Sequence, residues 1–123
     1  MSTQPYAIVF YETSSGRCYT REFLYELAVP VRAKFSKWLE ALEREGPNLP
    51  RPYADIVRGK IRELRVSFAG QQYRFLYFFY DKQIVITQGF VKKSWAIPEA
   101  EIDKAQRRMA DFIQRIERDE IME

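Results

Sequence analysis

The sequence predicts an α+β fold built around one antiparallel meander. Residues 61–93 read IRELRVSF-AG-QQYRFLYFFY-DK-QIVITQGFVKK, three runs rich in β-branched and aromatic residues joined by two short turns. Segments with apolar residues at helical spacing precede and follow this stretch. The expected order is therefore β-α-α-β-β-β-α, an antiparallel sheet with a helical hairpin on one face and a C-terminal helix.

The segments before the meander predict one strand and two helices. Residues 6–11 (YAIVFY) form a short apolar strand. Thr20 is the expected N-cap of a first helix, Pro30 suits the first turn of a second, and Gly46-Pro47 ends it. We expect Trp38 to pack in the core with the apolar stripe of this second helix.

Two further segments complete the prediction. Residues 46–53 (GPNLPRPY) predict a stiff, extended connection, and residues 54–59 a further turn of helix. A last helix starts near Pro98, and the acidic residues 117–123 are expected to fray from its end.

Length and composition indicate a single domain, residues 1–123, with 46% hydrophobic and 30% charged residues. No apolar run approaches the roughly 20 residues needed to span a bilayer, and the N-terminus lacks a secretory pattern, so we expect no membrane association and a cytoplasmic location. Cys18 is the only cysteine and histidine is absent, which excludes an intrachain disulfide and catalysis by histidine. We expect no metal and no cofactor.

The register of the meander follows from counting outward from its turns. If Ala69-Gly70 is the first turn, Arg65 faces Arg74, and if Asp81-Lys82 is the second, Arg74 faces Gly89. Arg65, Arg74 and Lys93 then share one face. The opposite face is expected to be the core, with Leu64, Val66, Phe75, Tyr77, Phe79, Ile84, Ile86 and Phe90.

Two facing arginines repel each other, so a sheet that keeps them is expected to bind an anion there. Residues 51–93 hold nine basic and three acidic residues, the distribution of a phosphate-binding surface. The phosphate backbone of RNA is the candidate; solvated edge and turn charges are the alternative. An apolar strip of Leu76, Phe78, Tyr80 and Val85 shares the face of Arg74, and the last helix or a partner would cover it.

Several short motifs occur in a characteristic order. They are GPNL at 46–49, RPY at 51–53, ELR at 63–65, YRFLYFF at 73–79, GFVKK at 89–93 and IPEAEI at 97–102. In this order the chain resembles the RelE/HigB superfamily of toxins of type II toxin–antitoxin systems, within its phage-derived HigB-like branch. The resemblance implies an mRNA endoribonuclease, acting on the ribosome or free, that a helix-turn-helix antitoxin of the HigA-like type holds silent.

The resemblance also implies site residues. Arg65 matches the arginine of the ELR motif, Arg74 that of the YR motif, and Lys92 and Lys93 the basic pair after the last strand. Members of the family often carry a histidine before the Gly-Phe of that strand, where this chain has Gln88. Because Gln cannot exchange protons, either another residue does that work or this copy is a weak enzyme.

Cleavage of RNA through its own 2′-hydroxyl requires a base, cations that stabilise the phosphorane, and an acid for the leaving oxygen. Arg65 and Arg74 suit the cationic role. Lys93 is the candidate base or acid, because neighbouring cations lower a lysine pKa. Glu63 is a second candidate base, or the counterion of the arginines.

Four residues are expected to bind RNA around this site without taking part in the chemistry. Arg62 and Lys60 contribute charge, whereas Tyr80 and Trp95 offer rings on which a base can stack. We expect this cleavage to be metal-independent.

Three other functions remain open at this point. The fold could inhibit DNA gyrase by protein contact, as ParE-like proteins do. The basic sheet could bind RNA without cleaving it, or the chain could be an inactive prophage protein. An adjacent reading frame for a small helix-turn-helix protein would favour the toxin interpretation.

Overall fold

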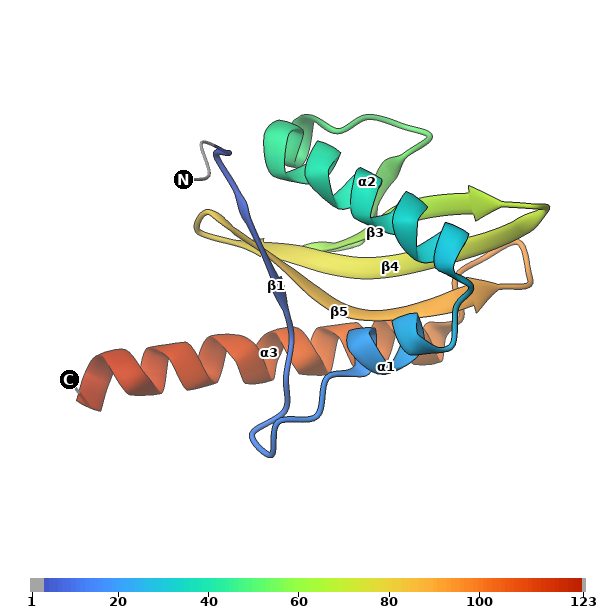
Figure 1. The fold of residues 1–123 in the computed structure, drawn as a ribbon. Helices are drawn as coiled ribbons and strands as arrows, with labels where there is room; N and C mark the ends of the chain where they lie inside the picture. Colours follow the sequence, from blue (N-terminus) through green and yellow to red (C-terminus); the bar gives the residue numbers. More distant parts are fainter. Residues whose placement is uncertain (1–3, 123) are drawn as a thin grey trace.

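A computed structural model describes residues 4–122, with side chains through residue 119, and confirms the α+β fold (Figure 1). The elements are β1 (Ala7–Phe10), α1 (Tyr19–Tyr25), α2 (Val29–Glu45), a 3-10 turn η1 (Gly46–Asn48), β2 (Ala54–Arg58), β3 (Ile61–Phe68), β4 (Gln71–Tyr80), β5 (Gln83–Lys92) and α3 (Glu99–Met122).

The five strands form one sheet in the order β1-β5-β4-β3-β2. β1 runs parallel to β5, and the remaining neighbours are antiparallel. The helices α2 and α3 lie on opposite sides of this sheet (Figure 1). The sheet therefore separates two hydrophobic clusters, one under α1 and α2 and one under α3.

Residues 54–58 form the strand β2, so the expected turn of helix is wrong. β2 pairs antiparallel with β3, with Asp55 opposite Glu63. Gly59 takes a positive φ of 54° in the connection between the two strands, a conformation that glycine adopts without steric cost. The pairing partner, which the local sequence does not reveal, decides the conformation of this short segment.

The predicted register is confirmed across the first turn and wrong across the second. Arg65 pairs with Arg74, and Phe68 with Gln71, as expected. Arg74, however, pairs with Phe90 rather than Gly89, because the register shifts between Leu76 and Tyr77.

The shift is a β-bulge that leaves Thr87 as the extra residue of β5, and its hydroxyl donates to the Leu76 carbonyl at 3.1 Å. As a result Lys92, which pairs with Gln72, shares the face of Arg74. Lys93 follows the end of the strand, so its expected place on that face is wrong.

The face under α1 and α2 is the aromatic core that the alternation predicted, with one exception. Phe35 of α2 stacks on Phe75 of β4 at a centroid distance of 3.9 Å. Phe90 belongs instead to the cluster under α3, as the bulge requires. A Cβ on Gly89 would lie 2.6 Å from the Phe75 ring, so this position needs glycine for the close approach.

The apolar strip on the other face is covered by α3, one of the two outcomes expected for it. Leu76, Phe78 and Val85 are fully buried in one cluster with Ala105 of α3. The ring of Phe112 contacts that of Phe78 edge-on at 5.7 Å. The strip therefore belongs to the folded core and is not an open surface.

The helix ends differ in detail from the prediction. α1 begins at Tyr19, and Thr20, expected as its cap, is buried and donates to the Ile86 carbonyl at 3.4 Å. Pro30 lies in the first turn of α2, as predicted. α3 is continuous to Met122, beyond Glu117, where we expected it to fray.

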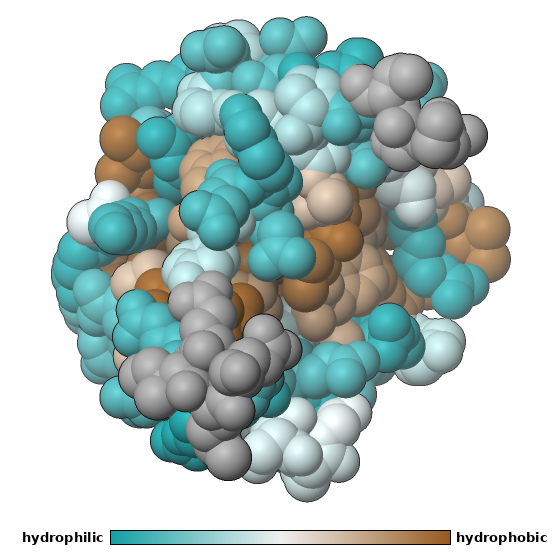
Figure 2. Space-filling view, turned by 90° about the vertical axis from the view of Figure 1, so that its left-hand side faces the viewer, coloured by the Kyte–Doolittle hydropathy of each residue, from teal (hydrophilic) through white to brown (hydrophobic). Residues whose placement is uncertain are grey.

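Figure 2 shows the end of the molecule at which α3 terminates, where hydrophobic residues are visible between polar ones.

No helix in the described part of the chain is both long enough and apolar enough to cross a membrane.

Candidate functional site: a cleft at the free edge of β3

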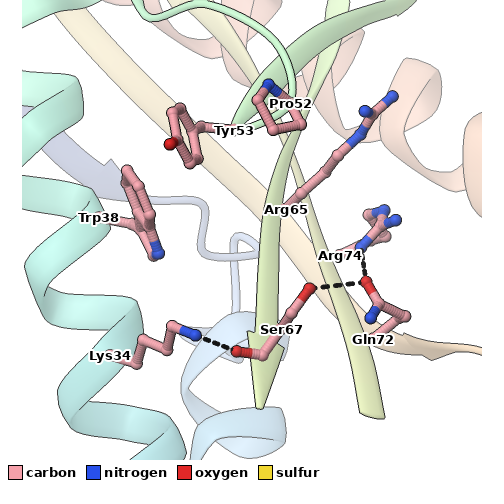
Figure 3. A pocket seen from close by; sticks show the side chains of 8 residues that line it. All are labelled: Lys34, Trp38, Pro52, Tyr53, Arg65, Ser67, Gln72 and Arg74. Carbon is pink, nitrogen blue, oxygen red and sulfur yellow. Dashed lines mark hydrogen bonds between the residues drawn. The ribbon is translucent and has the colours of Figure 1, made fainter. Parts of the chain in front are cut away.

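A cleft of about 320 Å³ opens where β2 leaves the edge of β3. The last paired residues are Ala54 and Leu64, after which the Arg65 amide donates to the Tyr53 carbonyl at 2.8 Å. Within residues 4–122 the rest of β3 pairs with no strand on that side. Figure 3 shows the cleft, which is lined by Lys34, Trp38, Pro52, Tyr53, Arg65, Ser67, Gln72 and Arg74.

The two arginines face each other across β3 and β4, as counting from the turn predicted. Since the amide of Arg65 points toward Tyr53, the pair of Arg65 and Arg74 occupies a non-hydrogen-bonded position of the ladder, where facing side chains are closest. Without compensation this arrangement would be destabilising.

Compensation comes from within the protein. Glu63 is 6% exposed, and its Oε1 lies 2.7 Å from Arg65 Nε and 3.1 Å from Arg74 Nε. Asp55 adds a second carboxylate, 3.3 Å from Arg65 Nη2 and 2.9 Å from Arg51 Nε. The expectation that the facing arginines need an external anion is therefore wrong, because Glu63 is that anion.

Arg74 forms the deep part of the cleft. It is only 6% exposed, and its Nη1 donates to the Tyr73 carbonyl at 3.1 Å and to Gln72 Oε1 at 3.4 Å. Burial lowers the pKa of the Arg74 guanidinium, Glu63 opposes this effect, and Arg65 adds to it. An arginine stays protonated at neutral pH even so, and Arg74 therefore supplies a fixed positive charge.

Arg65 is the more accessible of the two arginines, with a side chain that is 30% exposed. Burial alone would raise the pKa of Asp55, but the hydrogen bond from the Ile56 amide and the ion pairs with Arg51 and Arg65 outweigh it, so that this pKa is lowered. Asp55 therefore stays charged, and it orients the outer edge of the Arg65 guanidinium.

Six of the eight lining residues were not predicted as site residues from the sequence, and three of these form the wall on the side of α2. Trp38 of α2 and Tyr53 of the preceding loop stack at 4.4 Å with an interplanar angle of 27°. Lys34, one turn earlier on α2, donates its ammonium to the Ser67 carbonyl on the free edge of β3. Trp38 packs against the core under α2, as expected, and also stacks on Tyr53 at the cleft wall.

The two lysines predicted to be catalytic lie at the end of β5 and directly after it. Lys92 is half-buried on the face of Arg74, opposite Gln72, whereas Lys93 is exposed beyond β5. Neither lines the cleft itself.

The cleft does not bring together the four predicted RNA-binding residues. Arg62 lies on the opposite face, 5.3 Å above the Phe79 ring, and Lys60 lies between β2 and β3, at the far end of β3. Tyr80 ends β4, where its ring meets that of Phe112 at 5.8 Å. Trp95 is 97% exposed in the connection between β5 and α3, so it is accessible but outside the cleft.

Gln88, the departure from the family pattern, is also outside the cleft. It is 3% exposed, and its Nε2 donates to the Glu101 carbonyl at 2.7 Å. Arg108 Nη1 donates to its Oε1 at 3.1 Å. Gln88 thus joins β5 to α3. Within the described residues no group of three or more metal-ligating side chains forms a cluster.

Comparison with known proteins places most of the chain in one family. The model of the phage-derived protein Gp49-like family matches residues 22–110, which include every residue that lines the cleft. No curated protein matches the chain. The chain belongs to the phage-derived Gp49-like family.

Proposed function

We propose that this protein is a toxin of the RelE/HigB type, an mRNA endoribonuclease that acts without a metal ion. The observation that carries the proposal is the cleft lined by three cationic side chains, Lys34 of α2, Arg65 of β3 and Arg74 of β4. Its volume of about 320 Å³ is within the range of small-ligand sites and suits one unstacked nucleotide. Membership in a phage-derived family is consistent with a prophage origin.

In the proposed reaction the 2′-oxygen of a ribose attacks the adjacent phosphorus and loses its proton to a base. The bond from phosphorus to the 5′-oxygen breaks, and that oxygen receives a proton. The products are a 2′,3′-cyclic phosphate and a 5′-hydroxyl. Arg65, with its partly exposed guanidinium, binds the phosphoryl oxygens in the transition state, and the buried Arg74 adds positive charge behind it.

The proton transfers are assigned to two lysines, one on the sheet beside the cleft and one on its wall. Lys92 replaces Lys93 as the first candidate on the sheet, because the bulge turns Lys92 toward the face of Arg74. Lys34 is the candidate on the opposite wall. Glu63 serves as a counterion rather than a base, since both arginines already hold its Oε1.

RNA binding without cleavage is a second candidate function, and one observation favours it. The side chains that line the cleft include no histidine and no carboxylate, so the proton transfers of the nuclease would depend on lysines. In either case the proposed partners are mRNA, on the ribosome or free, and a helix-turn-helix antitoxin of the HigA-like type encoded nearby.

Incubation of the purified protein with RNA in EDTA tests the proposal. We expect cleavage with cyclic-phosphate ends, and a loss of about 100-fold or more in Arg65→Ala, as for removal of one transition-state donor. Arg44→Ala, which removes a positive charge from the last turn of α2, is the matched control and should cleave normally. RNA that is bound but left intact would support the second candidate; RNA that is neither bound nor cut, with or without ribosomes, would contradict both.

A further inference from the structure

We infer that Tyr53 is a stacking platform for one base of single-stranded RNA, and that Lys34 and Arg65, on either side of β3, bind phosphates of the same strand. The inference rests on RNA as the target of the cleft and specifies how the cleft holds it. Tyr53 is 40% exposed although one of its faces packs on Trp38 at 4.4 Å. Trp38 therefore fixes the orientation of a ring that is still accessible from the cleft.

Two cationic side chains line the same cleft as this ring. Figure 3 shows Lys34 below Trp38, and Arg65 on the other side of β3. Of the two ion pairs of Arg65, the one with Asp55 is the longer, at 3.3 Å against 2.7 Å for Glu63. A phosphate can replace Asp55 at the outer guanidinium nitrogen while Glu63 continues to hold Nε, so that binding does not require Arg65 to leave its position.

The backbone of β3 adds a hydrogen-bond donor. The Ser67 carbonyl accepts from Lys34, which shows that this residue points its backbone groups to the free edge. Since the N–H and C=O of one strand residue point to the same side, the Ser67 amide also faces the cleft. An anion bound there would contact Lys34 and this amide together.

The same contacts favour a nucleotide over an added peptide strand. A free strand edge is a common docking site for an extended peptide. Here, however, Lys34 occupies the Ser67 carbonyl that such a strand would need. The cleft of about 320 Å³ is the size of one nucleotide rather than of a duplex, which favours a base from a single strand.

Titration with a short oligoribonucleotide that carries 2′-O-methyl groups and one 2-aminopurine tests the inference without cleavage. Its fluorescence should be quenched on binding, because the probe base stacks. Tyr53→Leu, which keeps apolar volume but removes the ring, should weaken binding about 10-fold or more and abolish the quench. Tyr53→Phe should behave as the wild type does.

Matched variants separate a local effect from a general one. Tyr25→Ala removes a tyrosine that is 73% exposed at the end of α1 and should bind normally. Lys34→Gln should weaken binding of the oligonucleotide and of inorganic phosphate, whereas Lys37→Gln, an exposed lysine of the same helix, should not. Thermal unfolding of each variant checks that the fold is retained.

The outcomes distinguish this inference from the proposed nuclease function. Binding by the Tyr53 variants at wild-type strength would overturn the inference and leave the nuclease proposal standing. So would a binding loss confined to Trp95→Ala, because the base would then stack on the connection after β5. Tyr53-dependent binding without any cleavage of natural RNA would support the inference and contradict the nuclease. Failure of the wild type to bind the oligonucleotide, with or without ribosomes, would overturn the inference, and cleavage of natural RNA would then decide the nuclease proposal separately.

Discussion

One face of the sheet has two halves that are buried in opposite ways. Under α3, Leu76 and Phe78 of β4 are fully buried by apolar contact with the helix. Two residues before Leu76 on the same strand, Arg74 is nearly as buried, but its neighbours are Glu63, Arg65 and Gln72, and no residue of α3 lines the cleft there.

The difference shows how stability and a binding site can share one surface. The apolar half gains free energy from the area it removes from water, about 25 cal/mol per Å². The charged half gains little in net terms, because ion pairs recover only part of the cost of taking the charges out of water. The charged half can therefore serve binding rather than stability, provided that α3 stabilises the neighbouring half of the sheet.

The largest expected effect is in the apolar half. Leu76→Ala should lower the free energy of unfolding by about 2–5 kcal/mol, as other buried leucine truncations do. Urea denaturation measures the change. Ile56→Ala on β2, where the side chain is 58% exposed, is the control and should cost far less. A loss below about 1 kcal/mol for Leu76→Ala would mean that α3 does not depend on this contact.

An intermediate effect is expected in the charged half. Arg74→Ala removes one cation from the buried Glu63 carboxylate but leaves Arg65 in contact with it, so the free energy of unfolding should fall by about 1–3 kcal/mol. Arg65→Ala removes the more exposed partner and should cost less, about 1 kcal/mol or below. Repulsion between the facing arginines alone would predict the opposite sign, a rise in the free energy of unfolding when either arginine is removed. A gain in stability in both variants would refute the assignment of Glu63 as their shared counterion.

The smallest effect is a pH dependence that only the charged half should show. The pKa of Asp55 is lowered in the folded protein from its usual 3.8, so the unfolded chain takes up the proton first as the pH falls. The stabilisation from Asp55 is therefore fully present above about pH 5 and is lost below about pH 4, toward the lowered pKa. Urea denaturation of the wild type and Asp55→Asn between pH 6 and pH 3 measures it, and other carboxylates cancel in the difference. The wild type should be more stable than Asp55→Asn at pH 6, and this difference in the free energy of unfolding should disappear toward pH 3. A difference that does not change with pH would exclude the ion pairs as its source.

The parts of the fold that are determined by residues close together in the sequence could be predicted. Ala69 and Asp81 adopt positive φ angles of 50° and 51° in the two turns, where the sequence predicted them, and the first turn alone fixed Arg65 opposite Arg74. The strand β2 was missed because ADIVR has no strong preference of its own and becomes a strand by pairing with β3.

The site was predicted less completely, for a geometric reason. Lys34 and Trp38 reach the cleft only because α2 lies along the free edge of β3, a placement that periodicity within α2 does not contain. The Arg51-Pro52-Tyr53 motif was the one available signal for that wall. The role of Glu63 as a counterion followed from the alternation and was one of the two roles expected for it, but the depth of its burial did not follow.

The bulge at Thr87 determines where β5 can change in length. Because Thr87 is the extra residue, Ile86 and Gln88 on either side of it already face as they would in a regular strand without it. Its deletion would keep every side chain on its own face, whereas deletion of a neighbour such as Val85 would turn one end of the strand over. Position 89 accepts few other side chains, since even a Cβ there would lie 2.6 Å from the ring of Phe75. Among relatives of unequal length, a gap at this one position is therefore compatible with an unchanged cleft.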